Sequence, residues 1–135
     1  MEMKKLLESF NHAINGIIDA VRTQRNMKIH IVAAIGVLIA CFFFDISKAE
    51  FLSLAITITM VISAELVNTA VEAAVDLNTN YYHPLAKVAK NTAAGAVLVT
   101  AINALLVGYI VFWDKLSNFS YEVVYKIKHS EPYMI

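Results

Sequence analysis

The chain has 135 residues and no formal net charge, and 59% of its residues are hydrophobic whereas only 16% are charged. Soluble domains carry roughly a quarter of charged residues, so this composition indicates a membrane protein and gives no reason to expect a nucleic-acid partner. A single cysteine, Cys41, excludes a disulfide framework within the chain.

The first predicted element is an amphipathic helix near the amino terminus. Between Leu6 and Val21 the apolar residues recur at spacings of one and three, which places them on one face of a helix. The opposite face is polar and includes Lys4 and Arg22. Because a long apolar run follows, we expect residues 1–28 to form a surface helix that lies in the membrane interface, together with its connector.

Three apolar segments follow, and they suit transmembrane helices, which need about 20 residues. Asp45–Glu50 is interpreted as the loop between the first two, and Pro84 as part of the first turn of the third. None of the segments carries the polar stripe that a soluble helical bundle would require. We therefore predict an all-α membrane protein with a three-span core. The core covers residues 29–116, and its spans cover about residues 29–46, 50–77 and 85–113.

The distribution of lysine and arginine predicts the orientation in the membrane. Five of these residues precede Ile29, and the second loop adds Lys87 and Lys90, whereas the first loop has only Lys48. Since basic residues concentrate on the cytoplasmic side, we expect a multi-pass protein of the cell membrane with a cytoplasmic amino terminus. Residues 117–135 would form an extracytoplasmic tail, whose aromatic, apolar and basic side chains could rest on the outer interface.

The second apolar segment continues into a stretch with three carboxylates, S-A-E-L-V-N-T-A-V-E-A-A-V-D-L, at residues 63–77. At about 100° per residue, five of its polar side chains fall within about a third of the helix circumference. Ionisable residues at membrane depth are candidates for function, although solvated carboxylates at a helix end are the simpler alternative. The residues on this face are Glu65, Asn68, Thr69, Glu72 and Asp76.

The next helix supplies the opposite charge, because Lys87 and Lys90 follow one turn apart with Asn91 beside them. Carboxylates that bind Mg²⁺ opposite lysines that bind phosphate are the parts that phosphoryl transfer requires. Known nucleotide signatures such as G-x-x-x-x-G-K-[ST] are absent. The four histidines are too dispersed to indicate a site, and each is interpreted as structural.

Three stretches together resemble the prokaryotic diacylglycerol kinase family of small integral-membrane lipid kinases. They are T-Q-R-N-M-K-I-H, the pattern E-x-x-N-[ST]-x-x-E-x-x-x-D from residue 65, and Y-H-P-L-A-K-V-A-K-N-T-A-A-G-A-V-L from residue 82. Within the family, the chain looks most similar to the Gram-positive branch, which phosphorylates undecaprenol. The resemblance covers about residues 6–116 and implies a homotrimer of three-span subunits that uses ATP and Mg²⁺.

The resemblance also implies roles for single residues. Glu65 matches the general base that acts on the lipid hydroxyl, and Glu72 matches the ligand of the metal ion that bridges the phosphates. Lys90 matches a lysine that contacts phosphate, and Tyr82 and His83 match the loop that meets the nucleotide. The implied ATP-binding set is Gln24, Asn68, Glu72, Asp76, Tyr82, His83, Lys90 and Asn91.

Two positions depart from the family's pattern. Gln24 stands where a glutamate commonly supplies a second metal ligand, and Asn91 stands where an aspartate commonly follows the lysine. Both residues keep an acceptor oxygen but lack the charge, so Gln24 is a doubtful metal ligand. Because fewer negative charges also repel ATP less, the net effect on the site is left open.

The leading interpretation is a Mg²⁺-dependent kinase that transfers the γ-phosphate of ATP to a lipid alcohol. Undecaprenol is preferred over diacylglycerol on the branch resemblance alone. The loss of charge at Gln24 and Asn91 leaves a catalytically silent membrane scaffold as an alternative. An ion-conducting oligomer is a further alternative, although the carboxylates cluster at one end of the span instead of lining a path.

Overall fold

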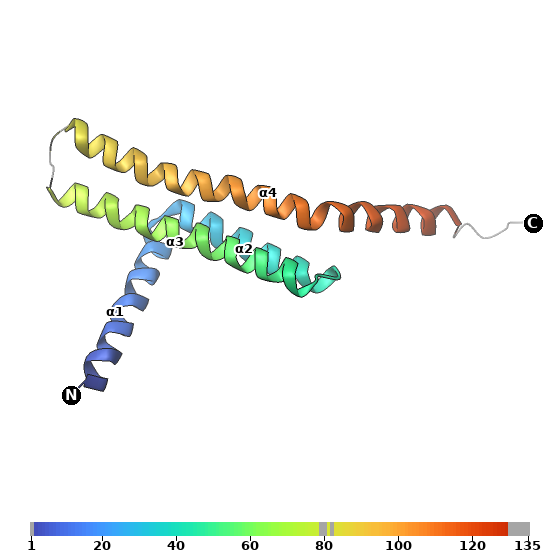
Figure 1. Ribbon diagram of the computed structural model, residues 1–135, viewed down its shortest axis with the longest axis horizontal. Helices are drawn as coiled ribbons and strands as arrows, with labels where there is room; N and C mark the ends of the chain where they lie inside the picture. The colour runs from blue at the N-terminus through green and yellow to red at the C-terminus, as the bar shows by residue number, and fades with distance from the viewer. Residues whose placement is uncertain (1, 79–80, 82, 130–135) are drawn as a thin grey trace, which may run out of the picture.

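The computed structural model describes residues 2–78, 81 and 83–129 of the chain. Figure 1 shows three helices gathered in a bundle, from which the first helix leads away at a steep angle. The described residues contain no strand, and the prediction of an all-α protein is confirmed. The helices are α1 (Glu2–Thr23), α2 (Arg25–Phe43), α3 (Lys48–Asn78) and α4 (Pro84–His129).

Three of these helices are long and apolar enough to cross a membrane, which agrees with the predicted number of spans. They are α2, with 19 residues, and the longer helices α3 and α4. At about 1.5 Å per residue, α2 extends about 28 Å, close to the thickness of the hydrocarbon layer. Most of their side chains are not covered by other parts of the chain, as is expected of helices that face lipid or other subunits.

α3 is the central helix, because it contacts each of the other three. Its contact with α4 is the most extensive, and Figure 1 shows these two helices side by side. The carboxyl-terminal half of α3 therefore faces the amino-terminal half of α4 at one end of the bundle, together with the start of α2. We call this end the site end. The opposite end, where residues 44–47 connect α2 to α3, is called the loop end.

The helix bounds differ from the predicted spans, because apolarity defines a span whereas backbone hydrogen bonding defines a helix. α2 ends at Phe43, before residue 46, and α3 begins at Lys48, inside the predicted loop. α2 begins at Arg25, ahead of residue 29, and α4 continues beyond residue 113 to His129. No proline or glycine follows residue 113 within the helix, so no helix-breaking residue interrupts it there. Pro84 is the first residue of α4, as predicted.

A single non-helical residue, Gln24, separates α1 from α2. Its backbone is extended, with φ −91° and ψ 122°. Its N–H donates to the carbonyl of Ala20 (2.9 Å), and its own carbonyl accepts from the N–H of Lys28 (3.4 Å), so the two helices meet without a loop. Ala20 and Met27 are buried on either side of this joint and tie both helices to the bundle.

Polar contacts join α3 and α4 at the loop end. Ser47 and Glu50 cap α3 reciprocally, since the N–H of Ser47 donates to a Glu50 carboxylate oxygen (2.7 Å) and the N–H of Glu50 donates to the Ser47 hydroxyl (3.3 Å). Lys115 of α4 reaches this cap, with its Nζ 3.1 Å from Glu50 Oε1 and 2.8 Å from the carbonyl oxygen of Asp45. We call Asp45, Ser47, Glu50 and Lys115 the loop-end clasp, because together they fix α4 against α3.

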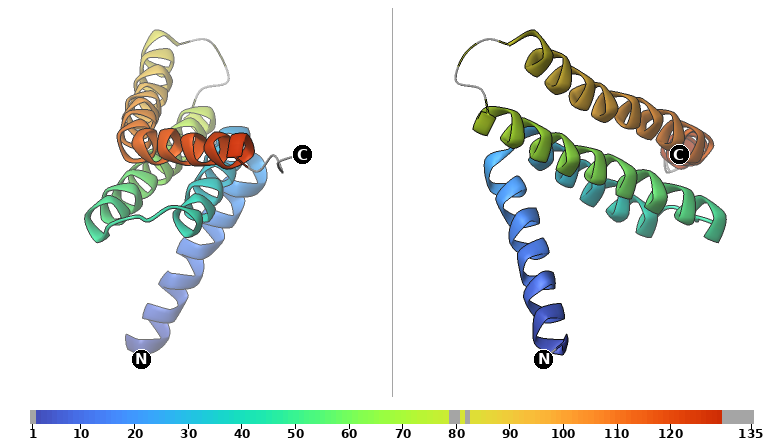
Figure 2. Two further views of the ribbon diagram at one scale, coloured as in Figure 1. Left: turned by 90° about the vertical axis from the view of Figure 1, so that its right-hand side faces the viewer. Right: turned by 60° about the vertical axis from the view of Figure 1, so that its left-hand side comes forward.

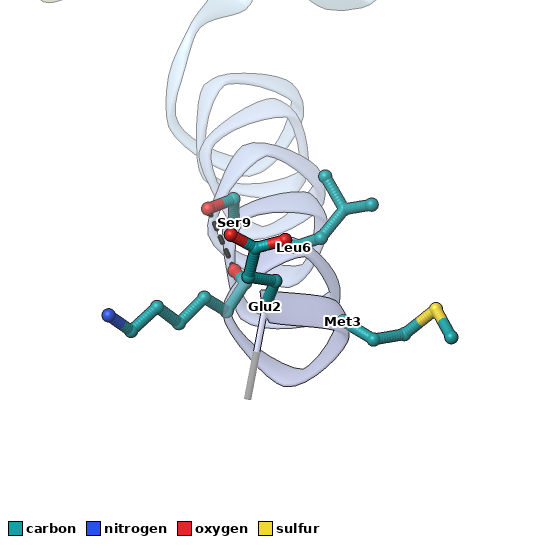
Figure 3. Close-up of a pocket in the computed structure, with 5 residues that line it drawn as sticks. Glu2, Met3, Leu6 and Ser9 are labelled. Carbon is teal, nitrogen blue, oxygen red and sulfur yellow. Dashed lines mark hydrogen bonds between the residues drawn. The ribbon is translucent and has the colours of Figure 1, made fainter.

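α1 is exposed along most of its length, including its apolar residues. A hollow of about 820 Å³ lies against its first turns. Figure 3 shows that one helix alone lines this hollow, with the Ser9 hydroxyl hydrogen-bonded to the carbonyl of Lys5 at 3.0 Å. A surface bounded on one side only is not a binding cavity, so the apolar face of α1 is available to a membrane or to another subunit.

Candidate functional site

The three spanning helices border a cavity of about 370 Å³ at the site end of the bundle. Its polar lining comes from α2 and α3, and its apolar wall comes mostly from α4. The cavity therefore brings charged and amide groups next to hydrocarbon. The polar residues are Asn26, His30, Glu65, Asn68 and Glu72, and the apolar ones are Ile29, Ala94, Val97, Leu98 and Ala101.

Glu65 and Asn68 are buried in this lining although both are polar. The exposed fraction is 1% for Glu65 and 6% for Asn68, and neither Glu65 Oε2 nor Asn68 Oδ1 has a hydrogen-bond partner in the described part of the chain. A buried acceptor without a donor destabilises a fold by about 1–3 kcal/mol. Two such acceptors on one cavity are available to a donor from outside the chain, such as water or a bound molecule.

The period of the helix positions these side chains. Glu65, Asn68 and Glu72 are three and four residues apart, so they lie on one face of α3. Asn68 Nδ2 donates to Glu72 Oε1 at 3.1 Å, which orients both side chains. The Thr69 hydroxyl instead donates to the carbonyl of Glu65 within its own helix (2.9 Å). Thr69 does not line the cavity, whereas the other three residues do.

An ion pair lies beyond the cavity, toward the end of α3. Lys90 Nζ of α4 is 2.5 Å from Asp76 Oδ1 of α3, and the two side chains are 37% and 64% exposed. Asp76 is about one turn beyond Glu72 on the same helix face. Asp76 and Lys90 thus form a charged, solvated pair next to the cavity, which we call the charged rim.

The residues before α4 border a second hollow at the site end. His83 and Tyr81 line it together with apolar residues of α3 and α4, around a volume of about 570 Å³. His83 Nδ1 also accepts a hydrogen bond from the N–H of Leu85 (3.2 Å), which caps the start of α4. Tyr82, the other loop residue predicted to meet the nucleotide, lies outside the described residues.

Two further residues of the predicted site do not line the cavity of this single chain. Gln24 occupies the joint between α1 and α2, and its side chain makes no capping hydrogen bond there. Asn91 is exposed on α4, next to Lys90 in the sequence. The roles predicted for these residues at the nucleotide and the metal ion therefore stay predictions.

Asn26 and His30 line the cavity. Both lie within the family-like stretch T-Q-R-N-M-K-I-H, but neither is among the predicted site residues. They are four residues apart at the start of α2 and so share one helix face. This polar pair at the edge of an apolar run is the signal that could have identified them. His30 and Glu65 are distant in the sequence and line the same cavity only because α2 packs on α3.

The described residues contain no group of three histidine, cysteine, aspartate or glutamate side chains that could hold a metal ion. Mg²⁺ does not need such a group, because it keeps several waters and binds one or two carboxylates together with substrate phosphates. Glu72 and Asn68 offer oxygen atoms of the kind that Mg²⁺ prefers, on one helix face. The residues present therefore fit a Mg²⁺ ion that is bound together with a nucleotide.

The sequence profile of the prokaryotic diacylglycerol kinase family matches residues 11–112, which include the whole cavity lining. The chain is 44% identical over 115 residues to an undecaprenol kinase of Bacillus subtilis (strain 168), a match that covers 85% of this chain and 94% of that protein.

Two other relatives are named diacylglycerol kinase, and the chain spans less than two thirds of the length of each. It is 44% identical over 104 residues to the one from Synechocystis sp., covering 76% of this chain and 59% of that protein. It is 32% identical over 80 residues to the one from Escherichia coli (strain K12), covering 59% of this chain and 65% of that protein. With its cavity inside the matched residues, the chain belongs to the prokaryotic diacylglycerol kinase family.

Proposed function

We propose that this protein is a lipid kinase that transfers the γ-phosphate of ATP to undecaprenol at the cytoplasmic face of the cell membrane. The observation that carries the proposal is the buried carboxylate of Glu65, whose unpartnered oxygen lies on a cavity with an apolar wall. A lipid alcohol brings the two groups that this cavity lacks, which are an O–H donor and an apolar chain.

Glu65 would act as the general base. The lipid hydroxyl would donate to Glu65 Oε2, and the carboxylate would take this proton as the hydroxyl oxygen attacks the γ-phosphorus. The bond from the γ-phosphorus to the oxygen that bridges it to the β-phosphate breaks, and ADP leaves. Ala94, Val97 and Ala101 would border the part of the lipid chain next to its hydroxyl.

The charged rim would hold the nucleotide. Glu72 and Asn68 would hold Mg²⁺, which supplies neutralising charge to the β- and γ-phosphates when it is bound. Lys90 would offset the charge that develops on the phosphate oxygens, and its ion pair with Asp76 keeps it at the rim. The family resemblance supports four further nucleotide contacts, at Gln24, Tyr82, His83 and Asn91.

Undecaprenol is the proposed acceptor because the relative matched over 94% of its length is named an undecaprenol kinase. The two relatives named diacylglycerol kinase are matched over smaller parts of this chain. Diacylglycerol is therefore the alternative acceptor, and the experiment described below separates the two lipids.

We also propose that the amino terminus faces the cytoplasm, that α1 lies in the membrane interface, and that three subunits assemble. The concentration of lysine and arginine before the first span supports the orientation. The uncovered apolar face of α1 supports its place in the interface. Ala96 is exposed on α4, and such a small residue lets a helix of a neighbouring subunit approach closely, which supports contact between subunits. The number of three subunits rests on the family resemblance.

The test uses the full chain, purified and reconstituted in phospholipid vesicles with ATP, Mg²⁺ and either undecaprenol or dioleoylglycerol. Undecaprenyl phosphate is the expected product. Its rate of formation should fall at least about 100-fold in Glu65→Gln, because a general base contributes about 10²–10⁴-fold. Thr69→Val is the matched control on the same helix and should retain activity.

The remaining outcomes also decide between hypotheses. Phosphatidic acid as the main product would identify diacylglycerol as the acceptor. No product from either lipid at saturating Mg²⁺ would overturn the kinase and would favour a silent membrane scaffold.

A further inference from the structure

α4 continues far beyond the bundle at the loop end. Its 46 residues extend about 69 Å, more than twice the ~30 Å of the hydrocarbon layer. Figure 1 shows its last, red part without a neighbouring helix. This part, Leu116–His129, lies beyond residue 112, where the family match ends, so the proposed kinase reaction does not account for it. We call it the terminal segment.

Two features mark where α4 leaves the hydrocarbon. Lys115 is fixed at the loop-end clasp by Glu50 and by the carbonyl of Asp45. Tyr109 and Trp113 precede it by less than two turns, with ring centroids 5.1 Å apart, and such residues concentrate at the boundary between membrane and water. The terminal segment therefore begins at the bilayer surface.

The exposed apolar face of the span continues into the terminal segment. Ile102, Tyr109, Leu116 and Val123 follow one another at steps of seven residues, which is close to two helical turns, and Ile127 follows one turn later. All five side chains are exposed. The side of α4 that is uncovered within the span thus remains apolar after the helix has left the span.

The terminal segment does not continue along the axis of the span. Figure 2 shows that the last, red part of α4 turns away from the direction of the rest of the helix. The ring centroid of Phe44 is 5.9 Å from that of Phe112 and 6.3 Å from that of Phe119, so this loop residue contacts α4 before and after Lys115. These contacts hold the start of the terminal segment against the end of the bundle, and the rest of the segment extends beyond the bundle (Figure 1).

The other faces of the terminal segment are basic and aromatic. Lys126 and Lys128 border the apolar face on its two sides. On the opposite face, Tyr121, Tyr125 and His129 are stacked, with ring centroids 6.5 Å and 4.1 Å apart. An apolar stripe bordered by lysines, with polar groups opposite, is typical of a helix that lies in a membrane interface.

We propose that the terminal segment docks on the bilayer surface at the loop end, with Leu116, Val123 and Ile127 among the lipid acyl chains. A phospholipid bilayer is the occupant because this face continues the exposed side of a spanning helix and begins at the level of the membrane boundary. A second copy of the chain is the competing occupant. However, a coiled coil needs its apolar pattern over about three to four heptads, whereas the terminal segment offers about two.

The test compares two positions of the full chain carrying Cys41→Ser, reconstituted in vesicles of phosphatidylcholine and phosphatidylglycerol. Val123→Cys reports on the apolar face and Tyr121→Cys on the opposite face, each labelled with bimane. Lipids with a nitroxide on the acyl chain should quench the label at position 123 at least about threefold more than that at 121, since the apolar face of such a helix lies about 5–10 Å deep. Circular dichroism of both variants checks that the helices are intact.

Other results would overturn the docking. Equally weak quenching at the two positions would show that neither face enters the bilayer, and equally strong quenching would show that the apolar face is not the side that docks. Weak quenching together with oxidative cross-linking of Val123→Cys between copies would assign the face to a second copy. Because fluorescence is the readout, the result does not depend on the proposed kinase activity.

Discussion

The side-chain amide of Asn68 donates a hydrogen bond to Glu72 across one turn of α3, at 3.1 Å. Its own oxygen is buried and has no partner in the described part of the chain. One side chain therefore orients a carboxylate and offers a second oxygen to the same cavity. Groups that orient a metal ligand affect metal affinity strongly, and this gives the first prediction.

Asn68→Ala should raise the Mg²⁺ concentration needed for half-maximal kinase activity by about 10–100-fold, because Glu72 loses the group that orients it. The measurement is a Mg²⁺ titration of the initial rate at saturating ATP. EDTA should abolish the activity of the parent protein, and added Mg²⁺ should restore it. Thr69→Val should keep the parent Mg²⁺ dependence, whereas an unchanged dependence in Asn68→Ala would remove Asn68 from the metal site.

Asp76→Asn should raise KM for ATP about two- to fivefold, because Lys90 loses a partner in an exposed ion pair that is worth up to about 1 kcal/mol.

Lys90→Met should have a larger effect, lowering kcat by at least about 100-fold, because the charge on the transferred phosphoryl group is then left without this cation. Steady-state kinetics in ATP measure both. Lys87→Met, an exposed lysine one turn away, is the control; if it behaves like Lys90→Met, net charge and not a contact explains the effect.

Ala101→Leu should raise KM for undecaprenol about tenfold or more while leaving KM for ATP unchanged. The added side chain would extend into the cavity from its apolar wall, where a shape mismatch costs on the order of 1–3 kcal/mol. Ile102→Phe enlarges the neighbouring, exposed position and should leave both constants near those of the parent. Equal effects of the two variants on both substrates would mean that the lipid does not enter this cavity.

His30→Ala should lower kcat/KM for undecaprenol by about 10–100-fold, because removal of the imidazole widens the cavity and lets the reacting hydroxyl shift away from Glu65. His30→Gln keeps a polar side chain at the same wall and should recover part of the rate. Kinetics with undecaprenol at saturating ATP measure the effect. Parent-like activity of His30→Ala would return this histidine to the structural role that the sequence alone suggests.

The loop-end clasp should contribute to stability without contributing to catalysis. A double-mutant cycle of Lys115→Met and Glu50→Gln should give a small favourable coupling free energy, as for an exposed ion pair. The measurement is unfolding in mixed micelles, followed by circular dichroism. Kinase activity well below the unfolding transition should be unchanged, because the clasp lies at the end of the bundle opposite the cavity. Lys48→Met serves as the surface control.

Much of the fold could be predicted because a bilayer imposes a single requirement, an apolar run long enough to satisfy its own backbone hydrogen bonds across the hydrocarbon. The common face of Glu65, Asn68 and Glu72 could be predicted for a similar reason, since it depends only on the helical period. The residues of the other helices that lie opposite this face of α3 could not be predicted in this way. Which residues of α2 and α4 meet it depends on how the helices pack, so His30 and Ala101 emerge as lining residues only from the structure.

A connector between the surface helix and the first span was predicted, but the exact position of the break was hidden in the sequence. No glycine or proline stands at or near Gln24, so no residue type indicates that the helix stops there. The break is instead associated with packing, since Ala20 and Met27 are both buried close to the joint. Burial of this kind involves residues distant in the sequence, and periodicity within one segment does not reveal it.

Because Gln24 alone joins the two helices, the direction in which α1 presents its apolar face is tied to the rotation of α2. One residue added or removed at this extended position would change both the rotation of α1 about its own axis and its angle to α2. The apolar face would then point in a different direction relative to the membrane surface. The orientation of α1 at the bilayer therefore depends on the number of residues in the joint as well as on the side chains of the helix.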